Sequence, residues 1–387
     1  MSKEEEELPK DVIIDILTRV PTKHILRFKS VSKTWNTLFQ TPSFVSKHTH
    51  NQTQLPALLF TPSDGTTNAT GLISLPEAQK PIRIPLELSI PFLNICKPLR
   101  VLGTCNGIVC LGVLPICSII LLWNPCTRVF KDLPVSRISR PPNGPIKVVL
   151  GFGYDKVDED YKVLRIVYYG YPLSQVEVYS LGTDSWREVK TSVKFLVFES
   201  GSSVFLNGAF HWTALGFEEM NGKKLIVGFG LREEVFKYIM PPKFEVGRGE
   251  KFSWNVVAVN GLLGVIGSVK RGTGKTFEVW VMEEYGVVSS WMKYRSFEVG
   301  AQFGRSLGCG LNGQVLVEKD DSELVMYDLD SQQIKNIGNH GVAYWSDVFN
   351  YVGSLLPIKG GKVVGRFNLS RVTPDPFFVR KMDLTIE

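Results

Sequence analysis

Two different hydrophobic patterns divide the chain. In the first fifty residues, apolar side chains recur at helical spacing, and Ile13, Ile16, Leu17 and Val20 fall on one helix face. Pro9 suits the first turn of this helix, and Pro21 ends it. After His50, short apolar runs alternate with Gly, Pro, Asn and Asp, which is typical of strands joined by tight turns. The pattern therefore predicts a small N-terminal α module followed by a large, mainly β domain.

The predicted helices are too short to be stable alone. Thr22 and Ser32 are suited to cap two further helices, and Pro42 to begin a fourth. Isolated helices below about 12–15 residues are marginal in water, and roughly forty residues bury too little surface for independent stability. The apolar faces of these helices therefore need a covering surface. That surface belongs either to the rest of this chain or to another protein.

The β region contains an internal repeat. Asn-Gly pairs, the preferred tight hairpin turn, occur at Asn106-Gly107, Asn207-Gly208, Asn260-Gly261 and Asn312-Gly313. The glycines at 107, 208, 261 and 313 are 101, 53 and 52 residues apart, so one period near 50 fits if a turn is missing from the first interval. We expect that turn near residue 155, in GFGYDKVDEDYKVLRI.

A second hairpin with a polar tip follows each turn. We expect the side chains after these tips to pack between neighbouring sheets; they are Phe130, Trp186, Phe236, Trp291 and Ile334. One four-stranded sheet per repeat predicts a kelch-like β-propeller of roughly six blades over residues 51–375. The irregular first block (55–88) and last block (342–369) are expected to share the blade that closes the ring. A β-sandwich and an irregular solenoid are the rival folds.

Composition narrows the environment and the partners. Among 387 residues, 44 basic and 38 acidic side chains give a net charge of +6 without a dense basic block, so we expect no nucleic-acid partner. The most apolar stretch, Ile108 to Trp123, falls short of the roughly 20 residues of a membrane span, so no membrane partner is expected. The acidic N-terminus lacks a secretory signal core, which favours the cytoplasm or nucleus. Residues 1–7 and 376–387 are predicted tails, the first of them disordered, and the cysteines are expected to be reduced.

The residues of catalytic sites are not clustered. Five histidines are spread along the chain, and we expect no enzyme activity, no metal and no cofactor. His48 and His50 read as an exposed helix end, and His211 as a packed residue. The phosphate-loop-like GTGKT at 272–276 leads into FEVWVM, which has the pattern of a strand. We interpret it as a hairpin tip that exposes Lys270, Arg271 and Lys275.

Two parts of the chain resemble known families. LPKDVIIDILTRVPTKHILRFKSVSKTWNTL resembles an F-box through Leu8-Pro9, Val20-Pro21 and the element from Ser32 to Trp35. Ser32 stands where many F-boxes have cysteine. GTCNGIVCL, LWNPCTRVFKDLP, GFGYDKVDEDYKVLRI and EVYSLGTDSWREV resemble the F-box-associated interaction domain of plant F-box proteins, including the S-locus F-box group.

The resemblance implies that the F-box module, residues 8–50, binds a Skp-type adaptor, which connects indirectly to a cullin and a RING subunit. The implied adaptor anchors are Leu8, Pro9, Ile13, Ile16, Leu17, Pro21, Leu26, Val31 and Trp35. Leu17 and Trp35 are equally suited to hold the helices together. The implied role is the substrate-recognition subunit of a ubiquitin ligase, which brings an unknown protein client to ubiquitination and proteasomal degradation.

Client contacts are expected in loops on one propeller face, because loops on rigid scaffolds carry binding functions. The candidates chosen by composition are Arg137, Arg140, Tyr169, Tyr171, Phe217, Lys270 and Arg271. Two alternatives remain open. One is a scaffold that binds the adaptor without delivering a client, and the other is a kelch-like binding module whose helices only cap the propeller.

Overall fold

The computed structural model describes most of the helical module and of the β domain. The described residues are 8–52, 57–60, 69–74, 82–85, 99–113, 119–136, 147–170, 173–198, 203–300, 302–310, 313–339 and 348–363. The predicted tails, 1–7 and 376–387, lie outside these ranges. None of the described helices is long and apolar enough to cross a membrane.

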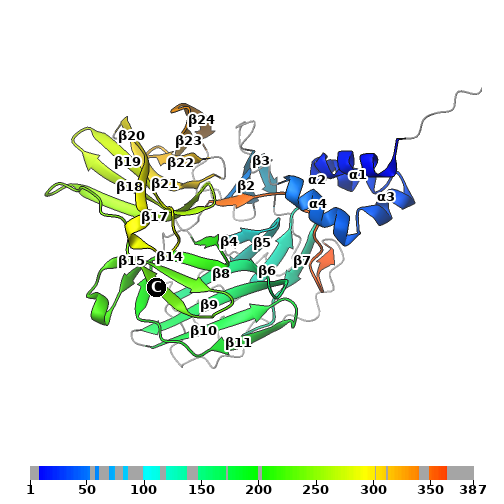
Figure 1. Ribbon diagram of the computed structural model, residues 1–387, viewed down its shortest axis with the longest axis horizontal. Helices are drawn as coiled ribbons and strands as arrows, with labels where there is room; N and C mark the ends of the chain where they lie inside the picture. Colours follow the sequence, from blue (N-terminus) through cyan, green and yellow to red (C-terminus); the bar gives the residue numbers. More distant parts are fainter. Residues whose placement is uncertain are drawn as a thin grey trace, which may run out of the picture.

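Four helices form a lobe beside a ring of sheets (Figure 1). They are α1 (Lys10–Arg19), α2 (Thr22–Phe28), α3 (Lys33–Leu38) and α4 (Pro42–Gln52). Pro9 and Pro21 immediately precede α1 and α2 with φ values of −52° and −54°, the range to which the proline ring is restricted. The predicted side-chain caps do not form: Thr22 is the first residue of α2, and Ser32 precedes α3 without a capping hydrogen bond.

Six antiparallel sheets are present among the described residues, and we number them as blades in chain order. Blade 1 has β1 (Ala57–Phe60), β2 (Ala69–Ser74), β3 (Ile82–Pro85) and β25 (Phe349–Tyr351). Blade 2 has β4 (Leu99–Cys105), β5 (Ile108–Val113), β6 (Ile120–Asn124), β7 (Val129–Asp132) and β26 (Lys362–Val363). Blade 3 has β8 (Lys147–Asp155), β9 (Asp160–Gly170), β10 (Leu173–Ser180) and β11 (Ser185–Val189).

The remaining blades follow the same order. Blade 4 has β12 (Phe195–Val197), β13 (Val204–Leu206), β14 (Ala209–Gly216), β15 (Lys224–Gly230) and β16 (Phe236–Ile239). Blade 5 has β17 (Lys251–Val259), β18 (Leu262–Arg271), β19 (Gly274–Met282) and β20 (Trp291–Gly300). Blade 6 has β21 (Phe303–Cys309), β22 (Gln314–Lys319), β23 (Glu323–Asp328) and β24 (Ile334–Asn339). Two 3₁₀ turns are η1 (Glu218–Met220) and η2 (Val288–Ser290).

The ring is closed by pairing the end of the chain with its beginning. The late strand β25 pairs with β1, so that Tyr351 lies opposite Ala57. This confirms, for β25, the prediction that the first and last blocks share one blade, whereas β26 of the last block pairs with β7 of blade 2. A separate hydrophobic core fills each junction between consecutive blades, including the junction of blade 6 with blade 1. The fold is therefore a β-propeller, as the repeat predicts.

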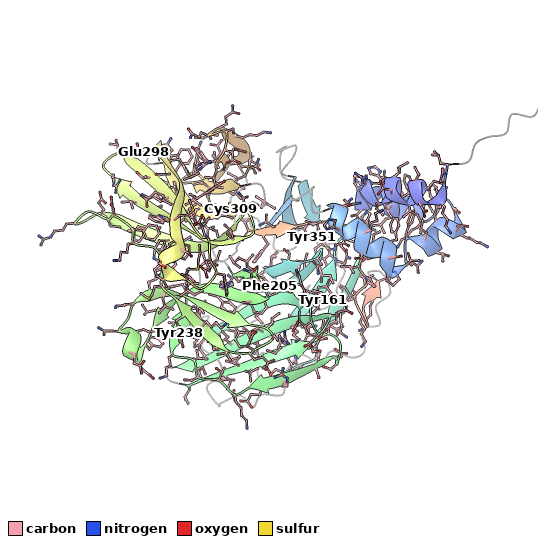
Figure 2. All side chains as sticks on the ribbon, viewed as in Figure 1. Tyr161, Phe205, Tyr238, Glu298, Cys309 and Tyr351 are labelled. Carbon is pink, nitrogen blue, oxygen red and sulfur yellow. The ribbon has the colours of Figure 1, made fainter. Side chains whose placement is uncertain are left out.

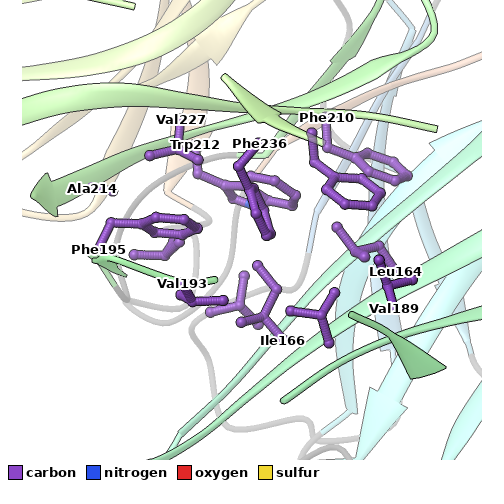
Figure 3. Packing of buried hydrophobic residues seen from close by; sticks show 14 of the residues in the cluster. Leu164, Ile166, Val189, Val193, Phe195, Phe210, Trp212, Ala214, Val227 and Phe236 are labelled. Carbon is purple, nitrogen blue, oxygen red and sulfur yellow. The ribbon is translucent and has the colours of Figure 1, made fainter. Parts of the chain in front are cut away.

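The junction of blades 3 and 4 shows how each sheet buries both faces. Phe195, Phe210 and Trp212 of blade 4 are at most 1% exposed, and they pack against Leu164 and Ile166 of blade 3 (Figure 3). A single sheet would leave one of these surfaces in water. Burial of apolar area between sheets is worth about 25 cal/mol per Å², so the blades stabilise one another through these junctions.

The hairpin turns confirm the predicted repeat. Asn106, Asn207 and Asn260 have φ between 48° and 52°, and the glycine after each also has positive φ. The turn missing from the first interval lies between Asp155 and Asp160, where β8 joins β9. Asn312 lies outside the described residues.

The residues after the polar hairpins follow the prediction with one exception. Phe130 and Phe236 are buried, while Trp186 and Trp291 are half-buried. These tryptophans donate Nε1–H to Pro134 O at 2.7 Å and to Met240 O at 2.9 Å, just after the last strand of the preceding blade. The prediction was wrong for Ile334, which is 52% exposed. A bulge between Leu324 and Val325 shifts the β23–β24 register, and Ile337, 3% exposed, takes the buried position instead.

Strand order gives the propeller two distinct faces. In blades 2 to 6, the first strand turns into the second, and the third into the fourth, at one face, which we call the turn face. The connection from the second strand to the third and the connections between blades lie at the opposite face, which we call the loop face.

Candidate adaptor and client surfaces

The helices of the module pack around one small hydrophobic core. Leu17, Ile25, Phe39, Phe44 and Val45 are each at most 5% exposed and form one cluster. A row of aromatic contacts runs from Phe28 through Trp35, Phe39 and Phe44 to His48. The burial of Leu17 corrects its expected role as an adaptor anchor, because a side chain 5% exposed offers a partner almost no surface.

An apolar surface remains uncovered on this module. Leu8 is 59% exposed, Val12 44%, Ile16 51% and Val31 69%. Val12 and Ile16 are four residues apart and therefore lie on the same side of α1. The periodicity that identified Ile16 also applies to Val12, which we did not include among the predicted anchors. We call these four side chains the exposed apolar set.

The other predicted anchors divide between solvent and core. Pro9 and Pro21 are exposed, and Ile13, Leu26 and Trp35 are half-buried against the helical core. No β-sheet seals Ile16 or Pro21. The structure therefore leaves these positions accessible to a partner.

Polar contacts hold the end of α1 against α4. His48 Nε2 lies 3.0 Å from Val20 O, and Gln52 Nε2 donates to the same carbonyl at 3.2 Å. Since a carbonyl only accepts, His48 carries its proton on Nε2. His48 is fully buried, which corrects its reading as an exposed helix end, and this burial lowers its pKa. The described residues contain no cluster suited to a metal ion.

One carboxylate links α1 to α4 by charge. Asp15 pairs with Lys47 at 3.0 Å and with Arg19 at 3.1 Å. The hydrogen bond from Lys47, followed by that from Arg19, lowers the pKa of Asp15. All three side chains are substantially exposed, so these pairs orient the helices more than they stabilise them.

The described client candidates lie at equivalent places in three consecutive blades. Tyr169 is at the end of β9, Phe217 follows β14, and Lys270 and Arg271 end β18. Each position is where a second strand leads to a third, so all four lie on the loop face. Arg137, Arg140 and Tyr171 lie outside the described residues.

These candidates differ in their accessibility. Lys270 and Arg271 are exposed, whereas Tyr169 and Phe217 are half-buried. Arg271 is also bound within the chain, because Nε pairs with Glu250 at 3.2 Å and Nη2 donates to Glu245 O at 3.0 Å. Lys275, predicted to be exposed, instead donates to Gly304 O and lies over the Phe277 ring, so the prediction was wrong for this side chain.

Lysines near the loop face join neighbouring blades, which the sequence patterns did not reveal. Lys147 donates to Val197 O at 2.5 Å, Lys224 to Trp254 O at 2.7 Å, and Lys275 to Gly304 O. Each bond reaches from one blade to the first strand of the next. The Lys224 ammonium also lies 4.4 Å from the Trp254 ring, and its burial lowers its pKa to about 8. These amines therefore have structural partners.

Exposed carboxylates predominate on the described turn face. They are Asp158, Glu159, Asp184, Glu233, Glu283, Glu284 and Asp330, and the exposed cations in the same turns are Arg128, Lys156 and Arg232. Both faces therefore carry exposed charged side chains, which allows charge reversal to test each face separately.

Comparisons with known proteins agree with these features. Residues 6–51 match the F-box domain, and residues 57–344 match the F-box associated beta propeller domain. Similar curated proteins from Arabidopsis thaliana include F-box protein At3g07870, 27% identical over 90% of this chain and 92% of the relative. F-box protein CPR1 is 26% identical over 85% of this chain and 84% of its own length. F-box/kelch-repeat protein At3g23880 is 27% identical over 83% of this chain and 87% of its own length.

Similarity to solved structures is weaker. A post-proline cleaving enzyme from Rickettsia typhi aligns with 86% of this chain and 59% of its own, at a TM-score of 0.40 and 10% identity. A score at this level does not bear on function. The family domains, in contrast, cover both the exposed helical module and most of the ring. The chain therefore belongs to the F-box proteins that carry an F-box associated beta-propeller domain.

Proposed function

We propose that this chain is the substrate-recognition subunit of an adaptor–cullin–F-box ubiquitin ligase. The F-box implies binding to a Skp-type adaptor, and the propeller implies a receptor-type role for a protein client. The finer steps that we propose are assembly with a cullin and a RING subunit, ubiquitination of the client and its degradation, in the cytoplasm or nucleus. In this role the chain is non-catalytic, and its contribution is a raised effective concentration of the client near the ubiquitin carrier.

The exposed apolar set carries the proposal for the adaptor. Leu8, Val12, Ile16 and Val31 are exposed to water, where apolar side chains are unfavourable. Burial of these side chains in an interface would be favourable. The proposed adaptor anchors are these four residues with Pro9 and Pro21, supported from beneath by Ile13, Leu26 and Trp35. Leu17 acts within the helical core.

The adaptor proposal is tested by a matched pair of charge insertions. Val31→Asp places a charge in the exposed apolar set, and Val157→Asp places one in a blade 3 turn, where the valine is 62% exposed against 69% for Val31. We expect Val31→Asp to weaken binding of a purified plant Skp-type adaptor at least tenfold, measured by calorimetry, while Val157→Asp leaves it unchanged. Equal adaptor affinity of Val31→Asp and the unaltered chain would contradict the assignment of this surface.

Client binding is proposed for the loop face, where the described candidates of three blades lie together. Charge reversal separates the faces: Lys270→Glu changes the loop face, and Glu284→Lys changes the turn face. Partners captured by proximity labelling under proteasome block should be lost with Lys270→Glu and retained with Glu284→Lys. The reverse result would move the client to the turn face. Capture of partners that do not accumulate when the adaptor surface is disrupted would favour the alternative of a scaffold without degradation.

A further inference from the structure

The chain that follows the closing strand enters two separate cores. We call residues 352–358 the coupling segment. Leu355, 5% exposed, is part of the same cluster as Leu17, Ile25 and Phe44 of the helical module. Ile358, 4% exposed, belongs to the core between blades 2 and 3. A span of four residues thus fills a place in both domains.

Hydrogen bonds fix this segment to the turn face of blade 2. Asn124, fully buried at the end of β6, donates through Nδ2 to Ser354 O at 3.1 Å and Leu356 O at 2.9 Å. Its Oδ1 accepts the backbone N–H groups of Cys126 and Thr127 at 3.0 and 3.2 Å. All polar atoms of this amide are satisfied, so no other side chain of similar size replaces it without leaving a buried group unpaired.

The backbone is closely packed where the coupling segment meets the helical module and blade 2. A Cβ on Gly353 would lie 3.0 Å from Thr22 Oγ1 of α2 and 3.2 Å from Cys126 Sγ of blade 2. A Cβ on Gly107, in the β4–β5 turn, would lie only 2.3 Å from Ser354 Cβ. The coupling segment is therefore enclosed between the helical module and one blade.

The same segment continues directly from the strand that closes the ring. Tyr351, at the end of β25, lies where the ring meets the helical lobe (Figure 2). Its hydroxyl is 3.4 Å from Cys126 Sγ, and Thr104 Oγ1 of blade 2 donates to Asn350 O. Displacement of the coupling segment from the helices is therefore expected to weaken the pairing of β25 with β1.

We propose that the coupling segment makes adaptor binding depend on closure of the propeller. When the ring is open, Leu355 is absent from the core of the helical module. The helices that form the adaptor surface then lose their fixed arrangement. Leu355 and Asn124 are positioning residues: both are buried, and they act on adaptor affinity through α1, α2 and α4. Only a chain whose propeller is complete joins the ligase. This inference rests on the proposed adaptor binding.

The first test uses two turn glycines as a matched pair. Gly107 and Gly208 occupy equivalent Asn-Gly turns with φ of 77° and 72°, but only Gly107 touches the coupling segment, since a Cβ on Gly208 meets nothing within 4 Å. We expect Gly107→Ala in the full chain to lower affinity for a purified plant Skp-type adaptor at least fivefold, and Gly208→Ala to leave it unchanged. Leu355→Ala should lower it at least tenfold.

The second test measures, in the unaltered chain, whether adaptor binding affects the strand that closes the propeller. Because linkage is reciprocal, adaptor binding must slow amide hydrogen exchange in the coupling segment and at β25, which belongs to the propeller. Unchanged exchange there, or equal adaptor affinity of Leu355→Ala, Gly107→Ala and the unaltered chain, would overturn the proposal while leaving the adaptor function intact. Absence of adaptor binding by the unaltered chain would instead overturn the proposed function.

Discussion

A buried histidine should make propeller stability depend on pH. His211 of β14 is fully buried, with Nδ1 3.2 Å from Val204 O and Nε2 2.8 Å from the Tyr285 hydroxyl. Because a carbonyl only accepts, Nδ1 carries the proton, and Nε2 accepts from the Tyr285 hydroxyl. Burial raises the pKa of Tyr285, and the negative charge of the nearby Glu233 raises it further. Burial lowers the pKa of His211 from 6.5 to about 4.

The size of the effect follows from this pKa. Between pH 6.5 and about 4, the unfolded chain binds a proton at residue 211 that the native chain does not, so native stability falls as the pH falls through this window. The loss from this residue is about 2 kcal/mol at pH 5 and about 3 kcal/mol below pH 4. Above pH 6.5 the contribution of His211 to stability is fully present.

The assay is urea unfolding followed by tryptophan fluorescence, at pH about 7.5 and about 5. We expect the unaltered chain to lose about 2 kcal/mol more than His211→Gln on acidification, because glutamine does not titrate. Carboxylates and His48 titrate in both proteins, so their contributions cancel in the difference. Tyr285→Phe removes the hydrogen bond but keeps the buried histidine, and it should retain the pH dependence. Equal acid losses in the unaltered chain and His211→Gln would refute the reasoning.

Two further stability changes follow from buried contacts of the propeller, one within blade 3 and one in outer strands, and both are measured by urea unfolding. Arg165 Nη1 pairs with Glu177 Oε1 at 2.6 Å, and both side chains are at most 8% exposed, so Arg165→Met should cost about 3–5 kcal/mol by leaving a buried charge alone. The double variant Arg165→Met with Glu177→Leu should cost much less, and equal costs would contradict an unpaired-charge origin. Phe130→Ala should cost about 3–5 kcal/mol, whereas Ile334→Ala should stay within about 0.5 kcal/mol, because Phe130 is fully buried and Ile334 is 52% exposed. Similar losses of unfolding free energy in these two variants would contradict the expectation that burial of the side chain sets its contribution to stability.

Local patterns determined much of this protein. The first helix, both prolines that precede helices and the tight turns depend on residues close together in the chain, because hydrogen bonding and backbone sterics act over a few residues. The repeat of these turns was sufficient to predict a propeller of roughly six blades, and an F-box could be identified from some thirty ordered positions. The repeat also located the turn between Asp155 and Asp160 without an Asn-Gly pair.

Tertiary structure decided which apolar residues are covered. Leu17 and Ile16 are adjacent and equally hydrophobic, but one is 5% exposed and the other 51%, since helix packing selects a face more narrowly than periodicity does. Leu355 completes the core of helices more than three hundred residues earlier in the chain. The partners of His48 and Lys224 likewise become visible only when distant segments meet. Sequence patterns record local spacing, whereas burial depends on contacts that ring closure creates.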